Sequence, residues 1–180
     1  MKKIVLTFAA AMVAMVMDAQ VYLGGTVGFT TVSQDGNSTT AFNIKPEVGY
    51  NLDNSWALGI VFGYGEKGKD ITKVKTFTVN PYARYTFVKF DRVSLFLDGG
   101  FSFINTKSNT ATGAVKNNKW EVGVKPGVAV ALNDKISFVS HMGFLGYSNS
   151  KDDTEGAKAE NTFGVNVDAT SLDFGFYFNF

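Results

Sequence analysis

The residues of this chain whose types could do chemistry are charged side chains within largely apolar segments. They stand at positions that alternate with apolar ones. Three basic and four acidic side chains occupy such positions: Lys45, Glu47, Arg84, Asp98, Glu121, Lys125 and Asp173. If these positions share one enclosed face, the charges must be paired or hydrated, because an isolated buried charge is too costly. We predict a salt-bridged network centred on Arg84, whose fork of donors suits a hub. Such a network either rigidifies the interior or opens a narrow water path when partners exchange.

Other residues with chemical potential fit no catalytic or ligand-binding pattern. His141 is the sole histidine and stands beside Ser140 in the middle of an apolar segment, but no motif supplies a converging nucleophile, base and orienting group. The glycines of 24–28 precede no helix, which excludes a dinucleotide loop, and the acidic residues of 152–155 lack calcium-loop spacing. We interpret His141 as an internal hydrogen-bonding group, and we expect no catalytic, cofactor-binding or metal-binding residue and no enzymatic activity.

The elements that position these residues are strands. Apolar and polar residues alternate after Gln20 without a convincing helical period, and this alternation predicts eight strands near 21–32, 41–52, 56–65, 75–88, 93–105, 119–132, 135–147 and 172–180. Long polar connections are expected at 33–40, 66–74, 106–118 and 148–160; the last can extend to Thr170, with a possible hairpin at 162–168. Short turns at 53–55, 89–92 and 133–134 alternate with them. Long and short connections therefore lie at opposite ends of the strands, which is typical of outer-membrane barrels.

The final nine residues are the most specific strand. Every second position carries a large apolar group: Leu172, Phe174, Phe176, Phe178 and Phe180. Asp173, Gly175, Tyr177 and Asn179 alternate with them and line the other side. An unprotected strand with an aromatic face would promote aggregation in water. A lipid bilayer would accommodate it.

The prolines mark a repeated unit. Pro46, Pro81 and Pro126 are the only prolines, and apolar residues alternate on both sides of each one before a short turn. The repeat indicates a meander of antiparallel hairpins. Because proline cannot donate to a strand ladder, we expect either a bulge or a missed hydrogen bond at each site.

Alternation alone does not say which face is inside, since a soluble barrel would place its aromatic face in the core. Three features favour a membrane barrel. The apolar face is too bulky for an eight-stranded interior, the polar face is rich in Gly, Ala, Thr and Ser, and aromatic residues gather near both strand ends as two belts. We therefore predict an all-β fold, an eight-stranded antiparallel up-and-down transmembrane β-barrel.

The first residues predict export. Met1-Lys2-Lys3 is a short basic segment, the uncharged run 4–17 is too short to span a bilayer, and Met17-Asp18-Ala19 provides a cleavage site before Gln20. We predict a cleaved signal peptide over 1–19, the alternative being a retained anchor, and a barrel domain over 20–180. The chain has no cysteine and a net charge of +1, which gives no basic field to hold nucleic acid.

The export signal, the eight alternating strands and the terminal Phe180 together resemble the small OmpA/OmpX-type outer-membrane barrel family. The resemblance implies a location in the outer membrane of a Gram-negative bacterium, lipid contact, and recognition of the Leu172–Phe180 pattern by the barrel-assembly machinery. We see no peptidoglycan-binding domain after the barrel. The expected role is structural, with surface interaction through long extracellular loops and an extracellular partner that the sequence does not identify. The alternatives are a small-solute porin with a salt-bridge-gated lumen, a barrel-based membrane enzyme and a soluble ligand-binding barrel.

Overall fold

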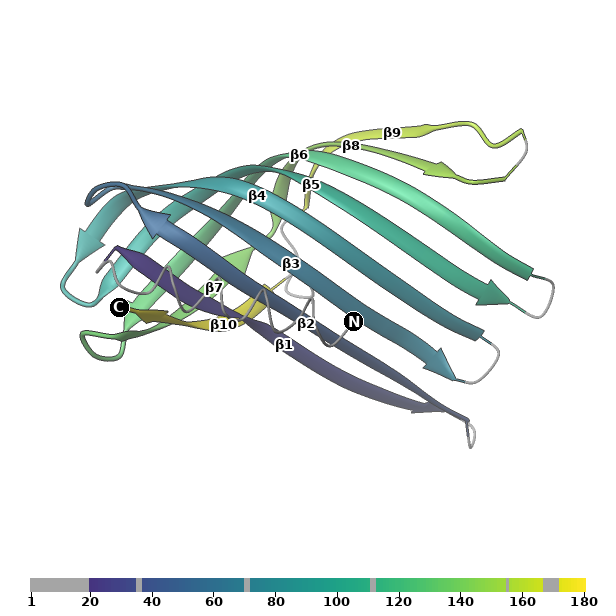
Figure 1. The fold of residues 1–180 in the computed structure, drawn as a ribbon, viewed down its shortest axis with the longest axis horizontal. Coiled ribbons are helices and arrows are strands. Elements are labelled where there is room, and N and C mark those ends of the chain that lie inside the picture. Colours follow the sequence, from purple (N-terminus) through teal and green to yellow (C-terminus); the bar gives the residue numbers. More distant parts are fainter. Residues whose placement is uncertain (1–19, 35–36, 70–71, 111–112, 155, 167–171) are drawn as a thin grey trace, which may run out of the picture.

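The computed structural model describes residues 20–34, 37–69, 72–110, 113–154, 156–166 and 172–180. Within them the chain forms ten antiparallel strand segments: β1 (Val21–Gln34), β2 (Asn37–Asn51), β3 (Trp56–Lys69), β4 (Thr72–Phe90), β5 (Val93–Thr110), β6 (Gly113–Ala131), β7 (Ile136–Met142), β8 (Phe144–Asp152), β9 (Glu160–Asn166) and β10 (Leu172–Asn179). Figure 1 shows them as long, tilted ribbons. The predicted signal peptide, 1–19, lies outside the described residues and stays a prediction.

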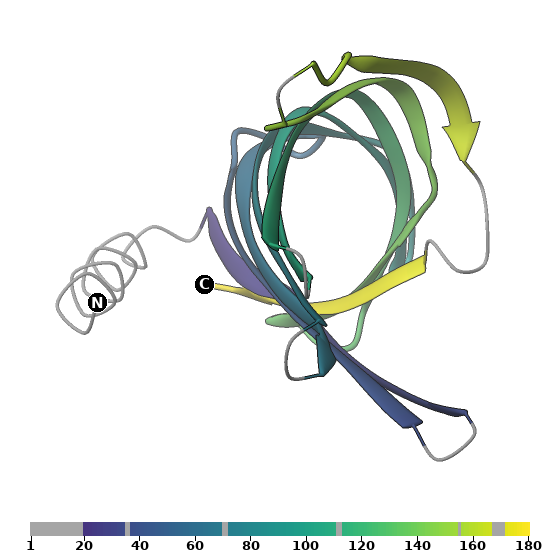
Figure 2. The ribbon, with the colours of Figure 1, turned by 90° about the vertical axis from the view of Figure 1, so that its right-hand side faces the viewer.

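The strands close into a barrel. Each strand from β1 to β6 pairs with its neighbour in sequence, β6 pairs with β7, β7 with β10, and β10 returns to β1. The ring is seen end-on in Figure 2. Where β1 and β10 pair, from Tyr22 to Thr26, antiparallel closure removes the exposed edges that an open sheet would present. The predicted eight-stranded up-and-down barrel is confirmed.

The seventh and eighth strands of the barrel each consist of two segments, β7 with β8 and β9 with β10. The seventh breaks at Gly143, whose φ of 70° lies in the left-handed region. Below the break β7 pairs with β10, and above it β8 pairs with β9. Weak alternation near 162–168 indicated a possible hairpin; the described residues there instead belong to a single strand, β9, which begins at Glu160 and pairs with β8. Among described residues, β1 pairs with both neighbours from Tyr22 to Thr26 and with β2 alone beyond that point.

Strand pairing extends further than the sequence indicated. Much of the polar segments 33–40, 66–74 and 106–118, which we expected to be loops, belongs to long hairpins. Pairing of β5 with β6, for example, continues to Thr110 and Gly113. These segments are rich in Thr, Asn and Lys, and once two strands are in register each further pair adds hydrogen bonds at little ordering cost. Polarity therefore marked where the strands leave the apolar band, while the strands themselves continue.

The large apolar side chains point outward. On β10, Phe174 is 53% exposed and Phe176 is 58% exposed, whereas Tyr177 between the phenylalanines is buried inside. Phe178 and the terminal Phe180 are also exposed; the side chain of Leu172 lies outside the described residues. A soluble barrel would bury these rings, so the face exposed here is the one expected to meet lipid. Within the described part of the chain, no helix has the length and apolar character needed to cross a membrane.

Each proline interrupts the ladder on one side only. Pairing of β2 with β3 stops at Lys45 and Pro46 and resumes in the same register. The same happens between β4 and β5 at Pro81. At Pro126 the pairing of β6 passes from β8 to β7 with a one-residue offset, opposite the break at Gly143. The first two sites are missed hydrogen bonds and the third is a bulge, so both expected arrangements occur.

Candidate functional site

Four aromatic rings turn inward near the short-turn end of the barrel. Each lies in register opposite a glycine of the neighbouring strand: Tyr22 opposite Gly49, Tyr82 opposite Gly59, Phe96 opposite Gly127 and Tyr177 opposite Gly24. A Cβ built on Gly49 would lie 2.1 Å from the Tyr22 ring. The missing side chains make room for rings that an eight-stranded interior would otherwise exclude. All four rings are buried and form a floor across the lumen.

Arg84, on β4, is the charged centre of this floor. Its Nε and one terminal nitrogen donate to the two carboxylate oxygens of Asp98, on β5, at 2.7 and 2.8 Å. The guanidinium also lies 3.9 Å from the centroid of the Phe96 ring. Two parallel hydrogen bonds fix the orientation of a buried guanidinium, and Arg84 is only 7% exposed.

A second carboxylate, Glu47 on β2, closes the other side of Arg84. The Arg84 guanidinium lies 3.6 Å from Glu47 and donates to the Tyr177 hydroxyl at 3.0 Å. Tyr177 in turn donates to the Glu47 carboxylate at 2.8 Å, and Tyr82 donates to it as well. The hydroxyls of Tyr82 and Tyr22 also hydrogen-bond. Strands distant in sequence are thus joined through one polar network, which supplies the partners that buried charges require.

His141, on β7, extends the network. Its Nε2 lies 2.9 Å from the Asp98 carboxylate, and its ring packs edge-on against Phe96. The imidazole and one terminal nitrogen of Arg84 therefore contact the same oxygen of Asp98, and these two nitrogens lie 3.4 Å apart. This is the internal hydrogen-bonding position that we expected for His141.

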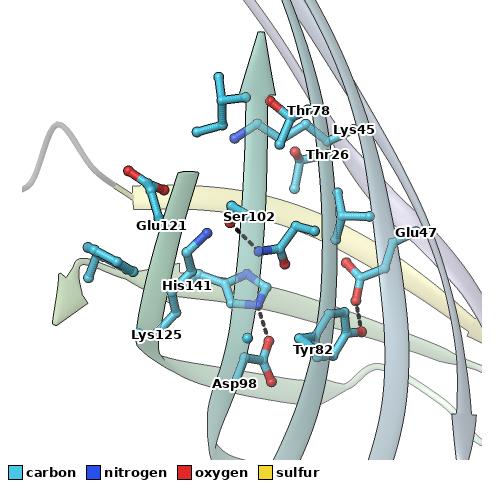
Figure 3. Close-up of a pocket in the computed structure, with 16 residues that line it drawn as sticks. Thr26, Lys45, Glu47, Thr78, Tyr82, Asp98, Ser102, Glu121, Lys125 and His141 are labelled. Atoms are coloured by element: carbon cyan, nitrogen blue, oxygen red, sulfur yellow. Dashed lines mark hydrogen bonds and ion pairs between the residues drawn. The ribbon is translucent and has the colours of Figure 1, made fainter. Parts of the chain in front are cut away.

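Above the floor the lumen opens into a cavity of about 280 Å³ that faces the long hairpins and is lined by charged, polar and apolar side chains. Figure 3 shows Lys45 and Lys125 entering it from different strands, with Thr26, Ser102 and Glu121 around them. Glu121 pairs with Lys119 at 2.7 Å. At liquid density, this volume would hold about nine water molecules. The cavity is open space large enough for water, whereas the floor beneath it is packed.

The predicted charge network is therefore divided between two levels. Glu47, Arg84 and Asp98 meet in the floor, while Lys45, Glu121 and Lys125 line the cavity. The backbone of Asp173 pairs opposite His141; its side chain lies outside the described residues.

Sequence reasoning missed the aromatic part of the site. Tyr177 was placed on the polar side of its strand but was not connected with the charges, and Tyr22, Tyr82 and Phe96 were not identified as part of the site. The available signal was the presence of inward glycines, each of which leaves room for one large neighbour. Reading it requires the cross-strand register, which alternation within one strand does not give.

Comparisons with known proteins agree with this architecture. A family model described as "Outer membrane protein beta-barrel domain" matches residues 4–180. Among proteins with curated functions, none matches this chain by sequence.

Several solved structures share the fold. Neisserial surface protein A (NspA) is 16% identical, with 89% of this chain and 97% of that one covered and a TM-score of 0.57. OprG from Pseudomonas aeruginosa is 11% identical over 89% and 96%, with a TM-score of 0.55. The N-terminal barrel domain of OprF from the same organism is 12% identical over 91% and 98%, with a TM-score of 0.52. Identities this low show the fold alone. The family match over nearly all of the sequence shows more: this chain belongs to the outer membrane protein β-barrel domain family and is an outer-membrane β-barrel protein.

Proposed function

We propose that this protein is a non-catalytic structural component of the outer membrane that presents its hairpins at the cell surface and does not conduct solutes in its resting state. The supporting observation is the floor, in which Arg84 is bonded to Asp98 and flanked by Glu47, and is almost fully buried. A porin needs a continuous water path, and this packed layer interrupts it. Arg84 contacts carboxylates from two other strands, so the floor ties the barrel wall together from inside.

The hairpins β1–β2, β3–β4, β5–β6 and β8–β9 support the surface role, because all four lie at the same end of the barrel (Figure 1). In this family's architecture the long connections face outward and the short turns face the periplasm. The proposal includes a Gram-negative host, export by a cleaved signal peptide and insertion by the barrel-assembly machinery, which reads the outward phenylalanines of β10. The proposed partner binds the hairpins from outside the cell, at a surface rich in Lys, Thr and Asn.

Surface labelling tests this orientation. The chain has no cysteine, so Thr154→Cys in the β8–β9 connection and Ser55→Cys in a short turn each introduce one thiol. A membrane-impermeant maleimide should label Thr154→Cys on intact cells and should label Ser55→Cys only after the outer membrane is permeabilised. The reverse pattern would contradict the proposed presentation of the hairpins.

A gated porin is the second candidate, and the cavity favours it, because a wet lumen already reaches the floor from the hairpin side. Planar-bilayer recording separates the two roles. The wild-type protein should give no steady conductance, and under the gate hypothesis Arg84→Ala raises the single-channel conductance. Lys119→Ala, which removes a lysine outside the floor, is the matched control. Traces that stay unchanged in Arg84→Ala leave the floor as a structural plug.

A further inference from the structure

Three lysines stand side by side on adjacent strands near the hairpin end of the barrel. Lys75 on β4 is directly opposite Lys107 on β5, and Lys107 is directly opposite Lys116 on β6. Directly opposite residues have Cβ atoms about 5 Å apart, and like charges at such positions destabilise the sheet. A row of this kind is expected where an anion from outside the chain offsets the repulsion.

The row lies on the outer wall. Lys107 has the same strand parity as Phe103, which is 45% exposed, and Lys116 has the same parity as Trp120. Side chains of one parity share one face of a strand. The three lysine side chains are exposed, so they project toward the membrane surroundings and not into the lumen.

Polarity along this wall changes in the order found in a membrane lipid. Phe101 stacks on Trp120 with ring centroids 6.1 Å apart, inside the apolar band. One step toward the hairpins, the amide of Asn105 donates to Asn118 at 2.7 Å. The lysine row follows one step further, about 7 Å beyond. Apolar rings, neutral amides and then ammonium groups match acyl chains, ester groups and phosphates.

Acidic residues lie at the ends of the row and leave its middle basic. Glu66, on β3, is opposite Lys75 and forms an ion pair with it at 3.9 Å. The same carboxylate pairs more closely with Lys73, at 3.0 Å. Asp153 lies beside Lys116 through a backbone hydrogen bond. Lys107 has a lysine on both sides.

We propose that Lys75, Lys107 and Lys116 bind the phosphate group of an anionic lipid in the outer leaflet, with its acyl chains against Phe101 and Trp120. The inference rests on the membrane location that the family shows, and the assignment to the outer leaflet rests also on the proposed outward orientation of the hairpins. Each lysine close to a membrane surface contributes roughly 1 kcal/mol of attraction to anionic lipid, equivalent to about fivefold in affinity. The row would therefore hold an annular lipid in place and relieve its own repulsion.

Tryptophan quenching can measure this preference, because the chain has only two tryptophans. In a Trp56→Phe background the emission reports from Trp120, at the site. The protein is reconstituted in phosphatidylcholine vesicles with brominated phosphatidylglycerol or brominated phosphatidylcholine as the quencher. We expect the anionic lipid to associate at Trp120 at least about fivefold more strongly than the zwitterionic one, with the ratio falling as salt is added.

Paired variants make the test decisive. Lys107→Gln combined with Lys116→Gln should bring the ratio close to one, whereas Lys107→Arg with Lys116→Arg should keep it. Lys89→Gln with Lys135→Gln, at the short-turn end, is the charge-matched control and should leave it unchanged. A heat-sensitive compact band on gels establishes that each variant is folded. An equal ratio for both lipids in the wild type, or a preference that survives in the glutamine pair, would overturn the proposal.

Discussion

The two halves of the lumen are built from the same strands but enclose different media. Toward the short turns, inward tyrosines and a phenylalanine fill the space above glycines and surround one arginine. Toward the hairpins, most inward positions carry Thr, Asn, Ser, Lys or Glu, with Val61, Ile104 and Phe144 among them, and the space between them is a cavity. The wall is continuous and alternates in the same way throughout. The comparison shows that a few inward residues, not the barrel geometry, decide whether an eight-stranded lumen is packed or wet.

Removing a charge should distinguish the halves most strongly. Arg84→Ala leaves Asp98 and Glu47 buried without their cation, and breaking a buried pair in this way costs about 3–5 kcal/mol. Lys119→Ala removes the partner of Glu121 in the half-exposed wall and should cost at most about 1 kcal/mol. Urea unfolding in lipid vesicles, followed by tryptophan emission, measures both. Equal losses would mean that the floor is as hydrated as the cavity.

A methyl group added to a glycine should have the next largest effect. Gly49→Ala would place its Cβ against the Tyr22 ring and force the floor to move, at a cost of about 1–3 kcal/mol. Gly164→Ala, on β9, is the control, because a Cβ there meets nothing within 4 Å. The same unfolding assay applies. A Gly49→Ala protein as stable as Gly164→Ala would show that the rings are loosely held.

The smallest effects concern two carboxylates at opposite ends of the barrel. Backbone N–H groups of Ser55 and Trp56 donate to Asp53 and lower its pKa, while the Lys73 ammonium, followed by the Tyr64 hydroxyl, lowers the pKa of Glu66. Both groups are held in the charged form when folded. Their contribution to stability is present above the ordinary carboxyl pKa and is lost as the pH falls through the lowered values.

Salt should separate these two cases. An ion pair at the surface is screened, whereas a backbone hydrogen bond depends less on ionic strength. Carbon-13 NMR of the side-chain carboxyls in detergent micelles should show the pKa of Glu66 rising toward its usual range with added salt, and that of Asp53 rising less. Equal shifts would contradict the assignment of different causes.

The sequence predicted the wall better than its contents. The alternating phenylalanines of β10 were enough to indicate an outward apolar face, because a strand's two faces can be read without any partner. The meeting of Glu47, Arg84 and Asp98 could be expected for a similar reason, since charges on an enclosed face must pair. The positions of Tyr22 and Phe96 over Gly49 and Gly127 could not, because each depends on the register between two strands.

The predicted strand lengths were wrong for a different physical reason. Polar composition in 106–118 suggested a loop, but pairing continues there because a hairpin already in register extends favourably through Thr and Asn. The break at Gly143 was equally hidden: it lies where Pro126 leaves the ladder on the opposite strand, and only the folded sheet brings these two positions together.

The pairing of β1 with β10 has a consequence for how the molecule is made. It joins Tyr22 to Asn179, so the seam links segments that are far apart in the sequence and has a very high contact order. The remaining strands can pair with a neighbour as they arrive, but the barrel closes only when β10 pairs with β1. Until then the edges of β1 and β10 are unpaired, and this is the stage of assembly at which the protein most needs assistance.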